Sequence, residues 1–479
     1  MNASLLSLEW MILGGGLVFL LLDLWTPAGK KRSLGYAAAA LVAVTLVWSF
    51  RVDASTPQLA FNDGYVLDAL ALFFKRFFLI ATIGVLLMSV DFADQFQAGI
   101  GEYYSLILFA LGGMMLAASA NDFTMLFVSI ELITVTFYVL TSFLRHKTPS
   151  LEAGIKYLIL GALSSGVMVY GIALVFGSSG TMKFGELAEK AAGLTHQKVF
   201  LIGALFLVAG LAFKISAFPF HVWTPDVYEG SPSPTTAFLA VGSKAAGFVL
   251  LLRFLFVAMP HAVVAEWSRV LMVMSGVTIL YGNLCAIPQR SLKRLLGYSS
   301  ISNGGYMLLG VAAMSHEGST AVLYYLSGYL FTVLAGFLVI SIVVRQLGSD
   351  DLKAIAGLHR RSPLLATALT LAMVSLAGVP PLAGFFGKFL LLKSVLEQGS
   401  SYYWLMAVAV VGVVISISYY LGVVRAIYWS DRPIEPKELI LGAPMRIALY
   451  ACVLGMLYLG LFPNFTLELA SRATGVLKF

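Results

Sequence analysis

Long runs of apolar residues, separated by short polar segments, make up almost the whole chain. A membrane-spanning helix needs about 20 mostly apolar residues, because the hydrocarbon core of a bilayer is roughly 30 Å thick. By this criterion the pattern predicts about 14 spans. Strands of a membrane barrel would show short segments of alternating polarity instead, so the spans are predicted to be α-helices. The predicted spans are 9–26, 34–50, 67–90, 103–120, 123–144, 154–176, 199–216, 235–257, 267–286, 295–314, 319–344, 366–396, 403–429 and 446–463.

Composition supports an integral membrane protein. Hydrophobic residues make up 59% of the chain and charged residues 11%, whereas charged residues make up about a quarter of an ordinary soluble domain. No polar stretch is long enough for a separate soluble domain. The chain has no CxxC cluster, Walker loop or dinucleotide fingerprint, so we expect no cofactor in it. Cys285 and Cys452 lie in or at the end of apolar runs and are expected to be buried hydrophobes rather than a disulfide.

The net charge of +7 is explained by membrane orientation better than by nucleic-acid binding, because the basic residues are spread over loops. If the N-terminus faces out, the inner loops hold 15 lysines and arginines and the outer segments hold 6. The positive-inside rule therefore predicts both termini outside, which in a bacterial inner membrane is the periplasmic face. The first apolar run lacks a basic segment before it and a clear cleavage site, so we expect it to be retained. Residues 181–192 are expected to form a short helix on the outer surface.

Four ionisable residues lie inside the predicted spans, namely Glu131, Lys214, Lys244 and Lys388. A charge at that depth costs at least a few kcal/mol and usually marks a functional site. For any one of them, a snorkelling lysine or a structural ion pair is the alternative. Lys156 is a weaker candidate, because a lysine near a helix end can reach the interface.

Lys75 and Arg76 lie within the third predicted span, in "LFFKRFFLI". Two explanations need no catalytic role. Either the span begins beyond them, or they find partners on a neighbouring helix.

Two of the spans are predicted to be broken. Pro219 follows Lys214 by five residues, and Pro380 and Pro381 precede Lys388. Proline inside a helix removes backbone hydrogen bonds, which a membrane protein tolerates only where protein or cavity water satisfies the freed groups. Both breaks thus lie beside a buried lysine.

The order of the spans indicates an internal repeat. Five spans starting at 103 can be matched to five starting at 267, and the broken span with its lysine is fourth in both sets. Because five is odd, the second copy is predicted to be inverted relative to the first. The predicted divisions are an N-terminal three-helix segment 1–102, a first repeat 103–257, a second repeat 258–429, and a C-terminal loop and helix 430–479.

Polar groups also occur between the buried charges. "GYSSISNGGY" at 297–306, "YYLSGY" at 324–329 and "SISYY" at 416–420 place hydroxyls and amides in apolar spans. They could line water, or they could bind one helix to another.

The stretch 218–239, "FPFHVWTPDVYEGSPSPTTAFL", resembles the corresponding segment of the antiporter-like membrane subunits of respiratory complex I. Asp226 is followed by Val-Tyr-Glu-Gly, the form of the subunit N (subunit 2) branch, whereas sibling subunits and multisubunit sodium/proton antiporters typically have Asp-Ala-His. The resemblance spans nearly the whole chain, and "GVPPLAGFFGKF" at 378–389 agrees with it.

This resemblance implies a proton-translocating subunit without redox groups, in a complex that passes electrons from NADH to quinone. The NADH, FMN, iron–sulfur clusters and quinone would then be bound by partner subunits, with subunits M and K as neighbours. Glu131 and Lys214 look like the family's interacting pair, Lys244 like its central lysine and Lys388 like its terminal group. Lys156 and His221 match auxiliary sites.

The expected burial of these lysines suggests how they could pass protons from one to the next. Desolvation lowers the pKa of a lysine and a nearby carboxylate raises it, so moving Glu131 relative to Lys214 would change the proton affinity of Lys214. Two other functions compete with this one. The chain could belong to a cation/proton antiporter or membrane-bound hydrogenase of the same fold, or its charges could only hold helices together.

Overall fold

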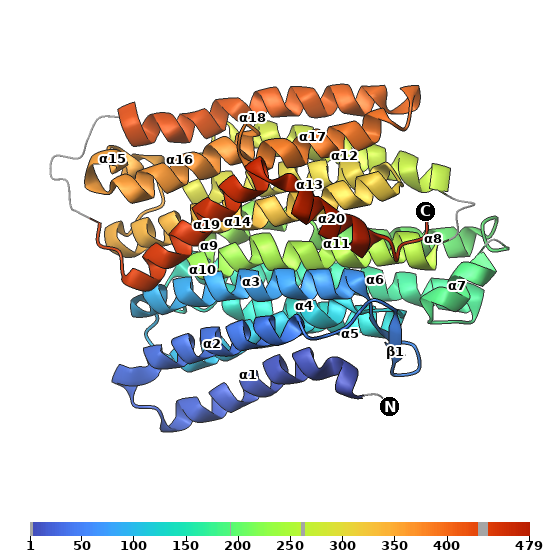
Figure 1. The fold of residues 1–479 in the computed structure, drawn as a ribbon, viewed down its shortest axis with the longest axis horizontal. Helices are drawn as coiled ribbons and strands as arrows, with labels where there is room; N and C mark the ends of the chain where they lie inside the picture. Colours follow the sequence, from blue (N-terminus) through green and yellow to red (C-terminus); the bar gives the residue numbers. More distant parts are fainter. Residues whose placement is uncertain (1–2, 192, 260–263, 430–438) are drawn as a thin grey trace.

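The computed structural model describes residues 3–191, 193–259, 264–429 and 439–479. Almost all of its elements are helices that lie side by side along one common direction (Figure 1). The first half contains η1 (Ala3–Leu6), α1 (Ser7–Trp25), η2 (Ala28–Lys30), α2 (Lys31–Ser49), β1 (Gln58–Ala60), β2 (Tyr65–Leu67), α3 (Ala69–Phe92), η3 (Ala93–Gln95), α4 (Ile100–Ala118), α5 (Phe123–Thr141), α6 (Thr148–Ser179), α7 (Phe184–Ala191), α8 (Lys198–Lys214) and α9 (Trp223–Gly230).

The second half continues in the same way, apart from two π-helical turns, η4 and η5, in the eighth predicted span. Its elements are α10 (Ser233–Phe238), η4 (Leu239–Ser243), α11 (Lys244–Arg253), η5 (Phe254–Ala258), α12 (Val264–Ala286), α13 (Leu292–Ala312), α14 (His316–Leu347), η7 (Leu352–Ile355), α15 (Leu358–Arg361), α16 (Pro363–Ala377), α17 (Ala383–Leu396), η8 (Ser400–Tyr402), α18 (Tyr403–Trp429), α19 (Ala443–Leu461) and α20 (Pro463–Thr474).

The predicted all-α membrane architecture is confirmed. Within the described part of the chain, 11 helices are long and apolar enough to cross a membrane. Three predicted spans fall outside that set. Span 199–216 is α8, which has 17 residues, span 295–314 is the polar helix α13, and span 366–396 is the two helices α16 and α17. The count of 14 therefore stays a prediction.

Both predicted helix breaks are present. Helix α8 ends at Lys214 and the next helix, α9, begins only at Trp223. Helix α16 ends at Ala377, and α17 begins at Ala383, five residues before Lys388. The division into two inverted repeats, with its boundaries, stays a prediction.

The segment from α10 to η5 is the most deeply buried span, with 94% of its most apolar window inside the protein. It passes close to the first break, because Gly247 on α11 has no side chain. A Cβ atom there would lie 2.8 Å from Ile215 Cγ2 and 3.1 Å from Lys214 Cβ. The absence of a side chain thus lets the helix that carries Lys244 approach the broken end of α8.

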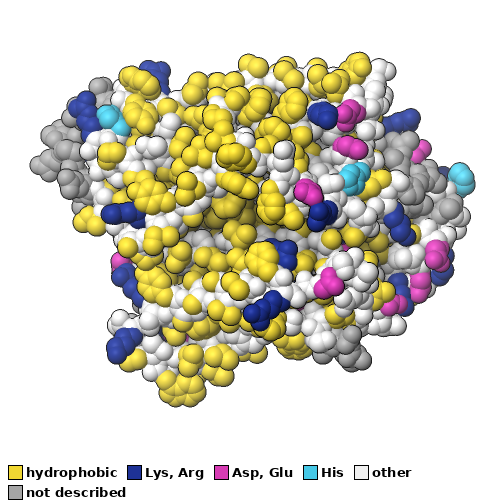
Figure 2. Space-filling view, in the orientation of Figure 1, with side chains coloured by type: hydrophobic (Ala, Val, Ile, Leu, Met, Phe, Trp, Pro, Cys, Tyr) yellow, Lys and Arg dark blue, Asp and Glu magenta, His cyan; other side chains and the backbone are white. Residues whose placement is uncertain are grey.

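The start of η1 and the C-terminal residues lie at the same end of the helix bundle (Figure 1), which we call the terminal end. Short helix α7 lies there too, where a surface helix was predicted. Two elements were not predicted: the hairpin of β1 and β2 at this end, and helix α20, which runs toward it (Figure 1). The face shown in Figure 2 is largely hydrophobic along the helices, and charged side chains gather toward both ends. That distribution suits a protein surrounded by lipid.

Lys75 has the partner on a neighbouring helix that the sequence left as one explanation. Helix α3 begins at Ala69, so Lys75 lies inside it, and its Nζ is 2.7 Å from Glu9 Oε1 on α1. The hydroxyl of Tyr65 lies 2.7 Å from the same Nζ. A second buried pair, Arg253 with Asp68, lies at the same end of the bundle.

Candidate functional site

Lys214 occupies the last position of α8, where the first break begins. It is buried, and its Nζ donates a hydrogen bond to the hydroxyl of Thr134 on α5. The Nζ also lies 5.9 Å from the ring centroid of Tyr157. A helix C-terminus stabilises positive charge through the partial charges of its free carbonyls, so the break itself favours a cation at this position.

Glu131 lies one turn before Thr134 on the same helix, but it is not in ion-pair contact with Lys214. Its Oε1 accepts a hydrogen bond of 2.5 Å from Ser165 on α6. The structure therefore brings Glu131 to the neighbourhood of Lys214 and shows the two separated, with Thr134 as the direct partner of the lysine. Side chains three residues apart on a helix are neighbours, so the carboxylate stays within reach of a local movement.

Lys244 lies at the start of α11, immediately after the π-helical turn η4, and is only 1% exposed. Its Nζ donates to the backbone oxygen of Ser300, 2.6 Å away, and lies 2.5 Å from the Oγ of the same residue. Gly304 leaves room beside it, since a Cβ atom there would stand 3.6 Å from the Nζ. Both of these hydrogen-bond partners of the Lys244 ammonium are neutral oxygens.

Helix α13 carries a polar face, and one end of this face contacts Lys244 on α11. Ser299 and Ser300, Asn303 and Tyr306 recur at three- to four-residue spacing, which places them on one side of the helix. All four are buried. These polar residues lower the hydropathy of α13, which is not among the 11 helices counted as long and apolar enough to cross a membrane.

Two tyrosines of α14 connect the α13 face along its length. Tyr329 donates to Ser300 Oγ over 3.1 Å, and Tyr325 donates to Asn303 Oδ1 over 2.6 Å. The two rings are stacked, with centroids 6.2 Å apart. Ser300, which contacts Lys244, and Asn303 are thus each held by one of two stacked tyrosines of α14.

Helix α18 supplies the next hydroxyl. Tyr420 Oη lies 2.5 Å from Ser299 Oγ and 3.4 Å from Asn303 Nδ2. Its neighbour Tyr419 donates to Asn283 on α12 over 2.9 Å. The polar stretches 297–306, 324–329 and 416–420, which are far apart in sequence, therefore form one buried cluster.

Lys388 lies on α17, just after the second break, and next to the Tyr306 end of the α13 face. It is 4% exposed, and its Nζ donates over 2.7 Å to the carbonyl of Leu376 at the end of α16. That carbonyl belongs to the last turn of a helix, where four such groups lack partners within the helix. The Nζ also lies 4.9 Å from the ring centroid of Tyr306, the last residue of the α13 face.

His221 lies in the first break, between α8 and α9, and is buried. Its ring packs against Phe218 and Tyr281, with centroids 5.4 and 4.3 Å away. Its Nδ1 has no hydrogen-bond partner within the described part of the chain. The structure thus places His221 beside the break without a direct bond to a buried lysine.

Lys156 belongs to a different, half-exposed group. Its Nζ lies 2.7 Å from both Asp226 and Glu152, and Asp226 also pairs with Arg294 at 2.6 Å. Arg294 in turn pairs with Glu229 at 2.8 Å. The acidic residues of the stretch "DVYEG" are therefore held by basic residues of α6 and α13, and Lys156 is not brought into contact with Lys214 or Lys244.

Sequence reasoning missed several members of the site, including Thr134, Ser165 and Tyr157. Thr134 had a signal, because it lies three residues after Glu131 in a span. Ser165 and Tyr157 had none, since their importance depends on how α6 is rotated against α5. Within the described residues, no group of three or more His, Cys, Asp or Glu side chains is arranged to hold a metal ion.

Comparisons with known proteins identify the family. Residues 120–416 match the family model described as NADH:quinone oxidoreductase/Mrp antiporter, TM. NADH-quinone oxidoreductase subunit N of Moorella thermoacetica is 40% identical over 97% of this chain and 96% of its own length. Its counterpart from Desulforamulus reducens is 39% identical over 98% of both. The chain belongs to the subunit N branch of this family.

Solved structures agree with this assignment. A chain of respiratory complex I from Thermus thermophilus with bound aureothin superposes with a TM-score of 0.82 at 31% identity, over 97% of this chain and 99% of that one. A chain of the Mrp complex from Dietzia sp. has a TM-score of 0.88 at 21% identity, over 100% and 98%. The second likeness shows a common fold. As a member of the subunit N branch, the chain is a multi-pass membrane subunit of a bacterial respiratory oxidoreductase complex and lies among other membrane-arm subunits.

Proposed function

We propose that this subunit translocates protons through two linked half-channels, driven by electron transfer from NADH to quinone in other subunits. The main support is the row of buried lysines with the α13 face between them. Lys244 contacts Ser300 at one end of that face, and Lys388 lies against Tyr306 at the other. Three lysines held by neutral oxygens are suited to exchanging protons, because the neutral form of a buried lysine is accessible while that of an arginine is not.

In this proposal Lys214, Lys244 and Lys388 carry the proton in turn. Glu131 acts on Lys214 by approaching or leaving it, and the observed arrangement, with Glu131 on Ser165, corresponds to the separated state. Tyr329, Tyr325 and Asn303, with water between them, pass the proton along α13. His221 serves the first half-channel, since imidazole accepts and donates protons near neutral pH. Lys156, held by Asp226, would act as an auxiliary group at the entrance.

One of the two tyrosines in the proposed relay, Tyr329, offers a test that leaves the lysines intact. Tyr329→Phe removes only the hydroxyl that donates to Ser300, so proton pumping per NADH oxidised is expected to fall several-fold in the assembled complex. Pumping is measured as dye quenching in proteoliposomes, beside the rate of NADH oxidation.

Tyr324→Phe is the matched control for this measurement. Tyr324 is a buried tyrosine of the same helix whose hydroxyl donates to Leu459, outside the α13 face. Its loss is expected to leave pumping near that of the parent complex. Equal pumping in both variants would mean that the hydroxyl of Tyr329 does not carry protons.

The proposed orientation, with the terminal end at the periplasmic face, also has a direct test. Glu189 on α7 and Ser349 after α14 are exposed and lie at opposite ends of the bundle. In a variant without Cys285 and Cys452, a cysteine at Glu189 is expected to react with a membrane-impermeant maleimide from the periplasmic side. A cysteine at Ser349 is expected to react only in inverted vesicles, and the reverse result would invert the topology.

We further propose that subunits M and K are its neighbours and that FMN, iron–sulfur clusters, NADH and quinone are bound elsewhere in the complex. The relatives are named as one lettered subunit of an NADH-quinone oxidoreductase, which supports a complex with further subunits. Copurification of the subunits, with measurement of flavin and iron in each separated chain, tests it. Flavin or iron that stays with this chain would contradict it.

A further inference from the structure

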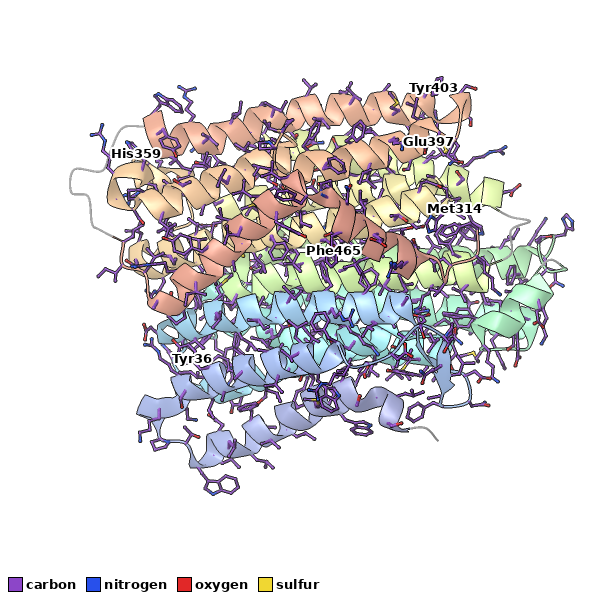
Figure 3. All side chains as sticks on the ribbon, in the orientation of Figure 1. Tyr36, Met314, His359, Glu397, Tyr403 and Phe465 are labelled. Carbon is purple, nitrogen blue, oxygen red and sulfur yellow. The ribbon has the colours of Figure 1, made fainter. Side chains whose placement is uncertain are left out.

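A groove of about 640 Å³ opens on the face of the bundle between α3, α14, α19 and α20. Helix α3 contacts each of the other three. Helix α20 breaks away from α19 at Pro463 and runs toward the terminal end across the front of the face in Figure 3, where Phe465 is labelled near its start. Helix α20 also contacts α14, and the groove lies where these four helices converge.

The walls of this groove are mostly apolar, which suits the binding of hydrocarbon chains. They are formed mainly by Phe73, Phe77, Leu330, Phe331, Leu459 and Phe465. Several wall residues are exposed, Phe465 to 60%, so the groove is continuous with the hydrophobic outer surface of the protein. Such walls exclude a polar metabolite and suit acyl chains.

Two arginines, Arg76 and Arg472, line the same groove, and the described residues that line it include no aspartate or glutamate. Arg76 lies about 10 Å along α3 from its first residue, by the rise of an α-helix. Its guanidinium donates to Ser49 O over 2.9 Å and to Ser49 Oγ over 3.3 Å, and lies 4.5 Å from the ring centroid of Phe50. These partners are all neutral.

The charge of Arg76 is therefore not balanced by the described part of this chain. Arg472 pairs with Glu468 at 2.5 Å, but both side chains are more than half exposed, and an exposed pair of this kind contributes little stability. An arginine at this depth is costly unless it reaches an anion. Guanidinium binds phosphate through paired N–H donors more strongly than it binds neutral oxygen.

We propose that the groove between α3 and α20 binds an anionic phospholipid. Its phosphate contacts Arg76 and Arg472 toward the terminal end, and its acyl chains lie along the aromatic and aliphatic walls. A polypeptide helix in the same groove would need an acidic residue opposite Arg76, whereas an anionic lipid brings both the charge and the hydrocarbon. The site would hold α20 against α3 and thereby the end of the chain against the N-terminal helices.

The test uses the whole purified complex. A photoreactive benzoylphenylalanine replaces Phe465, and the complex is reconstituted in nanodiscs of phosphatidylglycerol mixed with phosphatidylcholine, then irradiated. Mass spectrometry of the fragment that contains α20 is expected to find phosphatidylglycerol attached, enriched several-fold over its share of the lipid. Arg76→Gln and Arg472→Gln are each expected to abolish that enrichment, while hydrocarbon contact with phosphatidylcholine persists.

Arg51→Gln is the matched control, because Arg51 is an exposed arginine next to Phe50 that packs on Trp48 and does not line the groove. It is expected to keep the enrichment. If Arg76→Gln prevents assembly, Arg472→Gln alone decides, since Arg472 is exposed. Equal attachment of the two lipids in the parent complex, enrichment that survives Arg472→Gln, or attachment to a polypeptide of a neighbouring subunit would each overturn the proposal.

Discussion

Replacing Lys244 with arginine is expected to stop proton pumping while the complex still assembles in the membrane. The Nζ of Lys244 contacts only the carbonyl and hydroxyl of Ser300, and Gly304 leaves space beside it. A guanidinium can take over these hydrogen bonds and the positive charge. It cannot take over the release of a proton, because arginine stays protonated at any physiological pH. A relay through this position therefore ends at the substituted residue.

Lys244→Met separates the loss of charge from the loss of titration. Methionine has nearly the length of lysine and is apolar, so burying it costs nothing comparable to an unpaired charge. If Lys244 carries protons, both variants pump poorly. If it only supplies a fixed positive charge, the arginine variant pumps normally and the methionine variant does not, and the relay through Lys244 is then wrong.

Lys293→Arg is the control for placing a guanidinium in this protein. Lys293 is also a buried lysine whose Nζ donates to a carbonyl, that of Ser231 at 2.8 Å, but it lies at the start of α13 and outside the proposed relay. Arginine can keep that single hydrogen bond. Pumping per NADH oxidised is expected to stay close to that of the parent complex, measured in the same proteoliposomes.

The outline of the relay could be predicted from the sequence because its signals are local. A lysine in an apolar run, a proline beside it and small residues around it can all be read along one helix, and Lys214, Lys244 and Lys388 are all buried where that reading places them. The α13 face was visible as polar residues at 297–306. Hydrophobic periodicity predicts the side of a helix on which a residue lies, but not which helix lies opposite.

What the sequence could not supply are the partners across helices. Nothing in the spacing pairs Tyr325 with Asn303, or indicates that Ser165 rather than Lys214 would hold Glu131. The same holds for Lys156, whose contacts with Asp226 and Glu152 arise from the packing of α6 against α9 and from its own helix turn. Helix α20 was missed because it is amphipathic, so its apolar residues never form a run of spanning length.

The buried ion pair between Lys75 and Glu9 leads to the second large effect, this time on stability. Both side chains are essentially inaccessible to solvent, with exposed fractions of 0% and 1%. Tyr65 donates to Glu9 over 3.1 Å and lies 2.7 Å from Lys75, so the pair joins α1, the hairpin and α3. The contacts with Lys75 and Tyr65 are made by Glu9 Oε1, and Glu9 Oε2 has no hydrogen-bond partner within the described residues. The carboxylate therefore depends on Lys75 for its counter-charge.

Lys75→Met is expected to lower the free energy of unfolding by about 3–5 kcal/mol, because removing one partner leaves a buried charge uncompensated. The measurement is the thermal unfolding of the purified complex, together with the amount of this subunit that assembles. Lys393→Met is the control, since its pair with Glu397 is about half exposed and such pairs contribute roughly 0–1 kcal/mol. Only a small change is expected there.

The double variant Glu9→Gln, Lys75→Met decides what the pair does. Replacing both charges removes the uncompensated carboxylate, and a neutral amide beside methionine costs far less to bury than a single ion. Most of the lost stability should return, because the pair as a whole contributes much less than the penalty for breaking it. If the double variant is no more stable than Lys75→Met alone, the stability was lost through packing around α3 rather than through the uncompensated charge of Glu9. The ion pair between Lys75 and Glu9 is then not what the single substitution disrupts.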